Sequence, residues 1–258
     1  MRAIPRSLSD VGALLGTALL ALLVTGCATA PEHVDPRDPW EGFNRSVHAF
    51  NTDFDRGIGK PLAETYKLVT PEPVDTAVTN FFGNIGDLLV LINNLLQGKP
   101  GDAASDGGRV LMNTTFGILG FIDVASSVGL EAHNEDFGQT FGVWGIEPGP
   151  YVVLPFLGPH TVRDAVGWYV GFEVDDYWEF KDRDTRRALL ALELVDMRAD
   201  LMRTTNIVET AALDQYAFIR DAYLQRRQFL IYDGDPPEQN DYDYDYEDVT
   251  PAAAPMSP

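Results

Sequence analysis

The sequence has a single cysteine, and this scarcity excludes a disulfide bond within the chain. Cys27 is the only one among 258 residues. Cations are also scarce: 19 Lys and Arg stand against 39 Asp and Glu, which gives a net charge of −20. Nucleic-acid binders usually present a basic face to phosphate, and proteins that adhere to anionic lipid headgroups present clustered Lys or Arg. We therefore expect no nucleic-acid partner and no adhesion by bulk charge.

The N-terminal apolar run is too short to span a bilayer. It extends from Val11 to Val24, or 14 residues, whereas a spanning helix needs about 20. Arg2 and Arg6 precede it, and it is followed by Thr25-Gly26-Cys27, which is typical of a lipoprotein signal peptide with a lipobox. We expect residues 1–26 to be removed and Cys27 to carry the lipid. An uncleaved apolar anchor is the alternative.

The residue after the cysteine predicts the destination of the mature chain. Ala28, rather than Asp, follows Cys27. Under the sorting rule of enteric bacteria, this sends a lipoprotein to the outer membrane, where it would be lipid-anchored on the periplasmic side. Several acyl chains on one residue give stable anchoring, since each buried methylene contributes about 0.8 kcal/mol.

The sequence also lacks the common catalytic motifs. It has no Gly-x-Ser-x-Gly, no His-Glu-x-x-His, no phosphate-binding glycine loop and no dinucleotide fingerprint. His133, with Glu131, Glu135 and Asp136 nearby, is the one local group that could bind a metal or act as a general base. A polar loop is the favoured interpretation, because zinc sites with one histidine and no cysteine are uncommon. We expect no catalytic residue, no metal and no cofactor.

The sequence predicts that the mature chain is one domain with a polar extension at each end. No Pro/Ser-rich linker interrupts its middle. Residues 27–37 are small, polar and proline-containing, which suits a lipidated tether, and residues 38–232 form the body. Residues 233–258 contain eight acidic residues and no Lys or Arg. We expect a disordered acidic tail there, because such a composition cannot bury a core.

The body opens with a predicted helix. Asp38-Pro39-Trp40-Glu41 offers an N-cap, a proline in the first turn and a glutamate three residues after the cap, as in a capping box. Apolar residues then recur at spacings of three and four and share one stripe: Trp40, Phe43, Val47, Phe50 and Phe54. Core packing is the favoured interpretation of this stripe, and contact with a membrane or lipid is the alternative.

A second helix is predicted to start at Pro71 and Pro73. Its second half, Leu88 to Leu96, is apolar nearly all the way round, so it is either buried or in lipid. It is too short to span a bilayer but could lie within one leaflet, which is about 15 Å deep. A core helix is an equal alternative. The candidates for lipid contact or membrane exposure are Trp40, Phe43, Phe50, Leu88, Leu89, Leu91, Ile92 and Leu95.

The rest of the body also favours helices. Residues 109–121, 186–202 and 209–230 are predicted helices, whereas residues 141–156, with Gly149-Pro150 among β-favouring residues, suggest a hairpin or an ordered loop. Strands and helices do not alternate, so the fold class is mainly α. Three cations on or beside the last helix are expected to be solvated or paired with Asp221 and nearby acids: Arg220, Arg226 and Arg227.

At Asp38-Pro-Trp-Glu-Gly-Phe-Asn-Arg45 the sequence resembles the MlaA/VacJ family of outer-membrane lipoproteins. Further segments match the family in the same order: Asn94 to Gly98, Gly120 to Ala125, Gly149 to Phe156, Arg163-Asp164, and Arg220 to Tyr223. The resemblance implies a single-domain, ring-like helical lipoprotein embedded in one membrane leaflet, the inner leaflet of the outer membrane, often beside trimeric porins.

The resemblance also implies a function in lipid movement. Such proteins remove mislocalised phospholipids from the outer leaflet and pass them through an amphipathic channel to a soluble periplasmic carrier, MlaC. It suggests channel-loop candidates, Gly142, Gly145 and Gly149, in a stretch where Glu147 departs from the glycine-rich family pattern and weakens the inference of a hinge. A lipoprotein that scaffolds porins without moving lipid is the alternative, and an enzyme acting on lipids ranks third.

Overall fold

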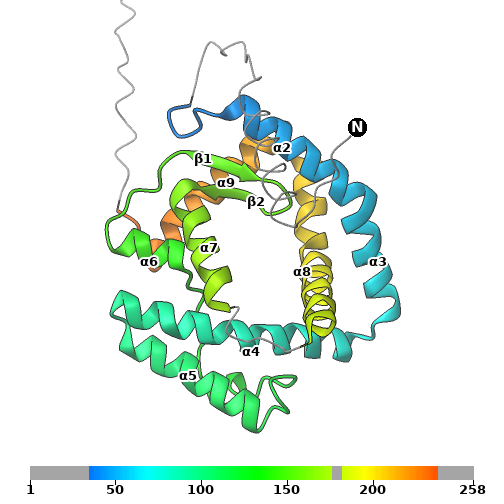
Figure 1. Ribbon diagram of the computed structural model, residues 1–258, viewed down its shortest axis with the longest axis vertical. Helices are drawn as coiled ribbons and strands as arrows, with labels where there is room; N and C mark the ends of the chain where they lie inside the picture. The colour runs from blue at the N-terminus through cyan, green and yellow to red at the C-terminus, as the bar shows by residue number, and fades with distance from the viewer. Residues whose placement is uncertain (1–34, 176–181, 238–258) are drawn as a thin grey trace, which may run out of the picture.

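The helices of this protein form a ring in the computed structural model, which describes residues 35–175 and 182–237 (Figure 1). The predicted signal peptide, Cys27 and most of the predicted acidic tail lie outside the described residues. Seven of the described helices and one hairpin make up the main part of the ring: α2 (Glu41–Phe54), α3 (Lys60–Val69), α4 (Glu72–Gln97), α5 (Pro100–Thr115), α6 (Phe137–Val143), the strands β1 (Tyr151–Leu154) and β2 (Gly158–Thr161), α7 (Val162–Asp175) and α8 (Arg183–Ala211). The last helix, α9 (Gln215–Ile231), lies behind the hairpin in this view. No helix of the described residues is long and apolar enough to cross a bilayer.

The start of α2 corrects the predicted capping box. The helix begins at Glu41, and no side chain caps it. Asp38 is instead fully buried, and its carboxylate accepts hydrogen bonds from Asn44 Nδ2 (2.8 Å) and the Tyr216 hydroxyl. It also pairs with Arg220. The prediction was wrong because these buried donors, from α2 and α9, occupy the carboxylate that would have capped the helix.

A π-helical turn, η1 (Asp55–Gly59), joins α2 to α3 and lies where the helical path bends around the ring (Figure 1). A Cβ at Gly59 would lie 2.5 Å from Asp55 Oδ1, so only glycine leaves room for this carboxylate. Asp55 in turn binds Arg198 of α8 through two hydrogen bonds, at 2.5 and 2.8 Å. This ion pair fastens the bend to the neighbouring helix.

The helix predicted over residues 109–121 is longer at one end and shorter at the other. It is α5, which starts at Pro100 and ends at Thr115. It packs along α4, and a Cβ at Gly107 would lie 2.8 Å from Leu91 Cδ1, so a larger residue there would displace this side chain. Residues 116–122 form a turn instead of a final helical turn.

The predicted hairpin exists but lies later in the chain. Residues 141–143 belong to α6, and the paired strands match Tyr151 with Thr161 and Leu154 with Gly158. Two side chains of α2 satisfy the free edge of β1. Asn44 donates to the Tyr151 carbonyl (3.1 Å) and accepts from the Val153 amide (2.9 Å). Asn51, two helical turns later, binds the Leu154 carbonyl (3.0 Å) and the Phe156 amide (2.8 Å) in the same way.

The two predicted C-terminal helices are present, but the break between them falls later than predicted. Residues 212–214 separate α8 from α9, and Asp214 caps α9 by accepting from the Ala217 amide (3.2 Å). Two of the three arginines of α9 are in ion pairs. Arg220 contacts Asp221, Asp35 and Asp38. Arg227 binds Asp136 and Asp164, acids far from it in the sequence.

The interior of the described ring is polar and its surface is rich in apolar side chains. Sixteen polar or charged residues are buried against eight apolar ones, four of which are alanines. At the same time, 36 large apolar side chains are exposed. Water-soluble proteins bury most of their large apolar side chains and rarely bury charges. This distribution is the reverse of the one that water-soluble proteins show.

Candidate functional site

An apolar stripe runs along one face of α8. Its members recur at spacings of four, three and four residues and are between 41 % and 63 % exposed: Leu190, Leu194, Met197 and Leu201. We call them the α8 stripe. The opposite face packs on α3, where Asp196 accepts a hydrogen bond from the Tyr66 hydroxyl (2.7 Å) and Ala199 is buried. Because α3 lies on the outer side of α8 (Figure 1), the stripe points toward the centre of the ring.

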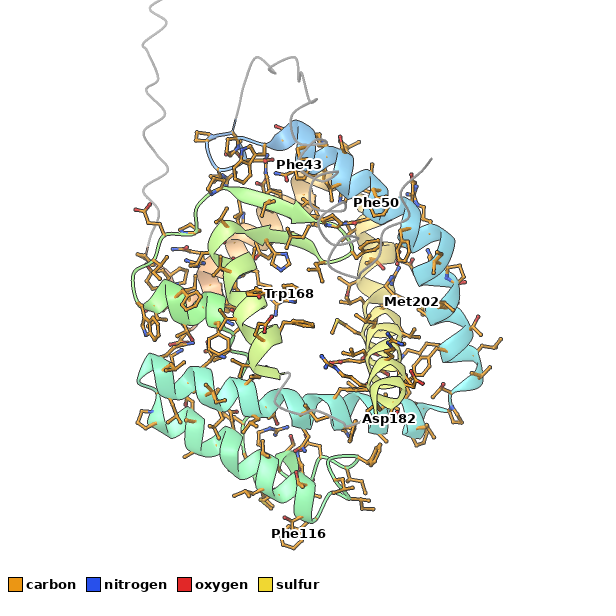
Figure 2. The ribbon with its side chains drawn as sticks, viewed as in Figure 1. Phe43, Phe50, Phe116, Trp168, Asp182 and Met202 are labelled. Atoms are coloured by element: carbon orange, nitrogen blue, oxygen red, sulfur yellow. The ribbon has the colours of Figure 1, made fainter. Side chains whose placement is uncertain are left out.

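A second stripe comes from α7, on the other side of the ring centre. Val162, Val166 and Tyr169 share one face and are 39–57 % exposed; we call them the α7 stripe. The opposite face packs on α6, where a Cβ at Gly167 would lie 2.3 Å from the Gly138 nitrogen. Since α6 lies outside α7, the α7 stripe also points inward. Figure 2 shows Trp168 of α7 and Met202 of α8 on either side of the centre.

Behind the α7 stripe lies a buried ionic network that fixes α7 to α6 and α9. Asp164 Oδ1 accepts from Arg163 Nη2 and Arg227 Nη2, each at 3.0 Å, and its Oδ2 accepts from the Tyr223 hydroxyl at 2.8 Å. Burial raises the pKa of Asp164, but the charge of Arg227 and the hydroxyl of Tyr223 outweigh this and hold the pKa below its usual value. The carboxylate is therefore a fixed negative charge that links α7 to α9, and Arg227 extends the link to Asp136 at the start of α6.

A comparable network joins α4 and α5 to the following loop. Arg109 of α5 is buried and pairs with Asp87 of α4 and with Asp123, each at 3.2 Å. Burial raises the pKa of Asp123, but its bonds to Ser126 and Arg109 outweigh this and lower it to about 2. Asn94 of α4 donates to Asp106 of α5 at 2.7 Å. These contacts supply polar links between helices whose outer faces are apolar.

The acidic residues near His133 in the sequence separate in space. His133 Nδ1 lies 3.0 Å from Asp106. Glu135 pairs with Lys99 (3.1 Å), and Asp136 pairs with Arg227 (2.5 Å) and caps α6. Within the described residues, no group of three His, Cys, Asp or Glu side chains is placed to hold a metal ion. The local cluster therefore forms three separate structural contacts.

The candidates for lipid contact divide into two sets by exposure. Trp40, Phe43, Phe50 and Leu95 are 43–57 % exposed. Leu88, Leu89, Leu91 and Ile92 are partly buried, and all the fully buried residues of α4 are polar: Asn84, Asp87, Asn93 and Asn94. The predicted apolar half of this helix is thus neither a core helix nor exposed all round. Contact of these side chains with lipid stays a prediction.

The glycines proposed for a channel loop lie in α6 and in the segment between α6 and β1. Gly142 is within α6, where a Cβ would lie 2.9 Å from Ile231 Cδ1. Gly145 and Gly149 have φ of +86° and +66°, in the region that favours glycine. Backbone bonds hold the loop between them, including that of the Arg163 amide to the Pro148 carbonyl (3.0 Å). Their role in a channel stays a prediction.

Sequence reasoning missed both inward stripes. The spacing from Leu190 to Leu201 is visible in the sequence, but other apolar residues of α8, such as Leu189, Leu192 and Val195, lie on its other faces and conceal which face matters. Helix α7 was not predicted, since Gly167 and Gly171 lower its helix propensity. Their purpose is apparent only from the packing of Gly167 on Gly138.

Comparison with known proteins gives consistent matches over most of the chain. The family model described as MlaA lipoprotein matches residues 36–230. The intermembrane phospholipid transport system lipoprotein MlaA of Escherichia coli (strain K12) is 34 % identical over 233 residues, covering 88 % of this chain and 90 % of that protein. The protein of the same name in Haemophilus influenzae is 32 % identical over 226 residues, covering 84 % and 90 %.

An uncharacterised protein of Rickettsia bellii is also 34 % identical, over 195 residues, or 75 % of this chain and 76 % of the relative. A solved structure described as "Structural basis for maintenance of bacterial outer membrane lipid asymmetry" superposes with a TM-score of 0.65 at 30 % identity. It covers 75 % of this chain and 98 % of that one. The sequence and structural matches agree on the same mainly helical fold.

Proposed function

This chain belongs to the MlaA lipoprotein family, and we propose that it removes mislocalised phospholipids from the outer leaflet of an outer membrane and passes them through its ring to a periplasmic carrier. The relatives in Escherichia coli and Haemophilus influenzae are named as lipoproteins of intermembrane phospholipid transport. Such transport maintains the lipid asymmetry of the membrane.

The observation that carries this proposal is the pair of apolar stripes facing the ring centre. An acyl chain can pass along apolar side chains without leaving apolar surroundings, which removes most of the cost of exposing it to water. The α7 stripe also carries a polar group, the Tyr169 hydroxyl, whose pKa the Glu173 carboxylate one turn away raises. A path with apolar walls and a few polar groups suits a molecule with two acyl chains and a polar headgroup.

The proposed position is within one leaflet, with the lipid on Cys27 as an additional anchor. The exposed apolar side chains of α2, including Phe43 and Phe50, and those of α4, such as Leu95, support contact with hydrocarbon. Trimeric porins and a soluble carrier of the MlaC type are the proposed partners. Moving a lipid breaks no covalent bond, so we propose no catalytic residue and no cofactor.

The test is whether the detergent-purified protein carries phospholipid, measured by mass spectrometry. We expect bound phospholipid in the wild type and a severalfold loss in Leu194→Asp, because an acyl chain lying against the α8 stripe would strip water from the unpaired carboxylate, which is costly. Leu111→Asp is the matched control, since Leu111 is 70 % exposed and lies on α5. Wild-type protein without lipid, or equal loss in both variants, would favour a scaffolding role.

The anchor has a separate test, metabolic labelling with palmitate. We expect label in the wild type and none in Cys27→Ser, because the modifying enzyme needs the thiol. Label that persists in the serine variant would contradict lipidation at this residue without affecting the proposal of transport.

A further inference from the structure

The turn after α5 is an apolar projection at the outer edge of the ring. Residues 116–122, which we call the apolar tip, contain no charged or hydroxyl side chain. All five of its large side chains are at least 40 % exposed: Phe116, Ile118, Leu119, Phe121 and Ile122. Figure 2 shows Phe116 at the periphery, beyond the end of α5 and away from the ring centre. The tip is therefore separate from the inward stripes.

Two residues of the tip have an unfavourable backbone conformation. Ile118 and Leu119 have φ of 54° and 59°. Left-handed conformations are disfavoured for residues with a Cβ and are particularly unusual for a β-branched one. Glycine or asparagine would fit these positions better on backbone grounds. The sequence instead places exposed apolar side chains there, which points to a use for them outside the packed protein.

The tip is held rigidly by the residues beneath it. A Cβ at Gly117 would lie 2.1 Å from the Ile122 carbonyl oxygen, and one at Gly120 would lie 2.8 Å from the Asn84 side chain, so neither position accepts a larger residue. Asn113 is 3 % exposed, and its side-chain oxygen accepts from the amides of Val124 (2.8 Å) and Ala125 (2.9 Å). The apolar side chains thus project from a fixed base.

Most backbone amides of the tip have partners within the protein. Six of its seven amides donate to carbonyls of the tip itself or of α5, including Gly120 to Asn113 (2.9 Å) and Ile122 to Gly117 (2.9 Å). The Phe121 carbonyl also accepts from the Asn80 side chain at 3.3 Å. A loop in water can leave such groups to the solvent, whereas a backbone in hydrocarbon must satisfy them internally.

We propose that the apolar tip inserts into the hydrocarbon of the membrane and fixes how the ring is seated there. This inference rests on the proposed leaflet position. Lipid is favoured over a protein partner because the tip is convex, uncharged and supplied with its own backbone bonds, and so offers no directional group for a partner to recognise. The nearest charge, Asp123, is turned inward to Arg109 and Asn113.

The first test measures the surroundings of position 116 in the full lipidated chain. Phe116→Cys carries an environment-sensitive fluorophore, and Glu131→Cys, an exposed polar position, is the matched control. The lipid is expected to occupy the Cys27 thiol, so a mass measurement should show one fluorophore per chain. In phosphatidylethanolamine and phosphatidylglycerol vesicles, we expect nitroxides on the acyl chains to quench position 116 about fivefold more than position 131, and aqueous iodide to do the reverse.

The second test replaces side chains of the tip with residues that its backbone conformation accepts. In the labelled chain, Ile118→Asn with Leu119→Asn removes the apolar side chains but suits the left-handed conformation. Ile118→Met with Leu119→Met keeps the apolar character. We expect acyl-chain quenching to fall severalfold in the asparagine pair and to remain in the methionine pair, with circular dichroism confirming that both are folded.

Iodide access at position 116 equal to that at 131 would overturn the proposal and favour a protein partner. Equal acyl-chain quenching of the asparagine and methionine pairs would overturn it as well. The proposal of transport can fail independently. If position 116 lies in hydrocarbon but the purified protein carries no phospholipid, transport is refuted and the insertion of the tip is not.

Discussion

Asn93 and Asn94 of α4 are fully buried, whereas the next two residues, Leu95 and Leu96, are 57 % and 42 % exposed. The contrast between these neighbours holds for the described protein as a whole. Its helices meet largely through asparagines, aspartates and arginines, and they leave leucines and phenylalanines exposed at the outer surface of the ring and toward its centre. In a water-soluble helical protein, the apolar face would be the one that packs.

In the proposed membrane position, this difference indicates which forces hold the ring together. Lipid surrounds apolar side chains as well as a protein core does, so burying them between helices gains little in a membrane. Close packing and interhelical hydrogen bonds have to hold the helices together instead. The contact of Gly167 with Gly138 supplies the first, and the bonds of Asp164 and Arg109 supply the second. The polar interior should therefore dominate stability, and the apolar exterior should matter mainly for membrane binding.

The largest expected effect comes from breaking the network around Asp164. Asp164→Ala should lower the free energy of unfolding by about 3–5 kcal/mol, because it leaves the buried Arg163 and the largely buried Arg227, whose side chain is 11 % exposed, without this shared partner. Denaturant unfolding in a mild detergent measures the change.

The matched control is Asp184→Ala, which removes a carboxylate that is 87 % exposed and lies 3.6 Å from Arg187. Its cost should stay below about 1 kcal/mol. If the two variants lost similar stability, the polar interior would not be what holds the ring together.

A smaller effect is expected from the asparagine clamps on β1. Asn44→Ala should cost about 2 kcal/mol, because Asn44 is fully buried and its loss leaves the Tyr151 carbonyl and Val153 amide without these partners. Asn51→Ala should cost about 1 kcal/mol, because its site lies nearer the surface and water can replace the amide. Thermal unfolding followed by circular dichroism ranks the two. A larger loss for Asn51 would mean that burial does not set the strength of these clamps.

The sequence predicted the fold class and most of the helices because these depend on local patterns. Prolines 71 and 73 marked the start of α4, and the apolar spacing of α2 marked its length. The partners of buried polar residues could not be predicted in this way. Asp38 has the position of an N-cap, and only the approach of Tyr216 and Arg220, some 180 residues later, assigns it elsewhere.

Which residues of α4 are buried could also not be predicted from the sequence. Asn93 and Asn94 interrupt the apolar run in the sequence, but their hydrogen-bond partners lie on α5 and α6 and could not be identified from the sequence. Asn94 binds Asp106 of α5, and Asn93 accepts from Thr140 of α6 at 2.7 Å. The inward stripes could not be predicted for the same reason, because which face of a helix points inward depends on how the ring closes.

The smallest effect on stability is expected at the exterior, in Leu95→Ser. Leu95 is 57 % exposed, so the unfolding free energy in detergent should change by less than about 0.5 kcal/mol. Leu91→Ser is the matched control one turn earlier, where the side chain is partly buried and reaches Gly107 of α5. It should cost about 2 kcal/mol or more, because it opens a cavity between the helices. Vesicle binding of chains made without residues 1–27 should show the opposite order for the folded proteins: weaker binding for Leu95→Ser and little change for Leu91→Ser, since only an exposed side chain loses contact with lipid. Equal losses of stability at both positions would mean that Leu95 is packed against protein, and the division between polar interior and apolar exterior would not extend to this end of α4.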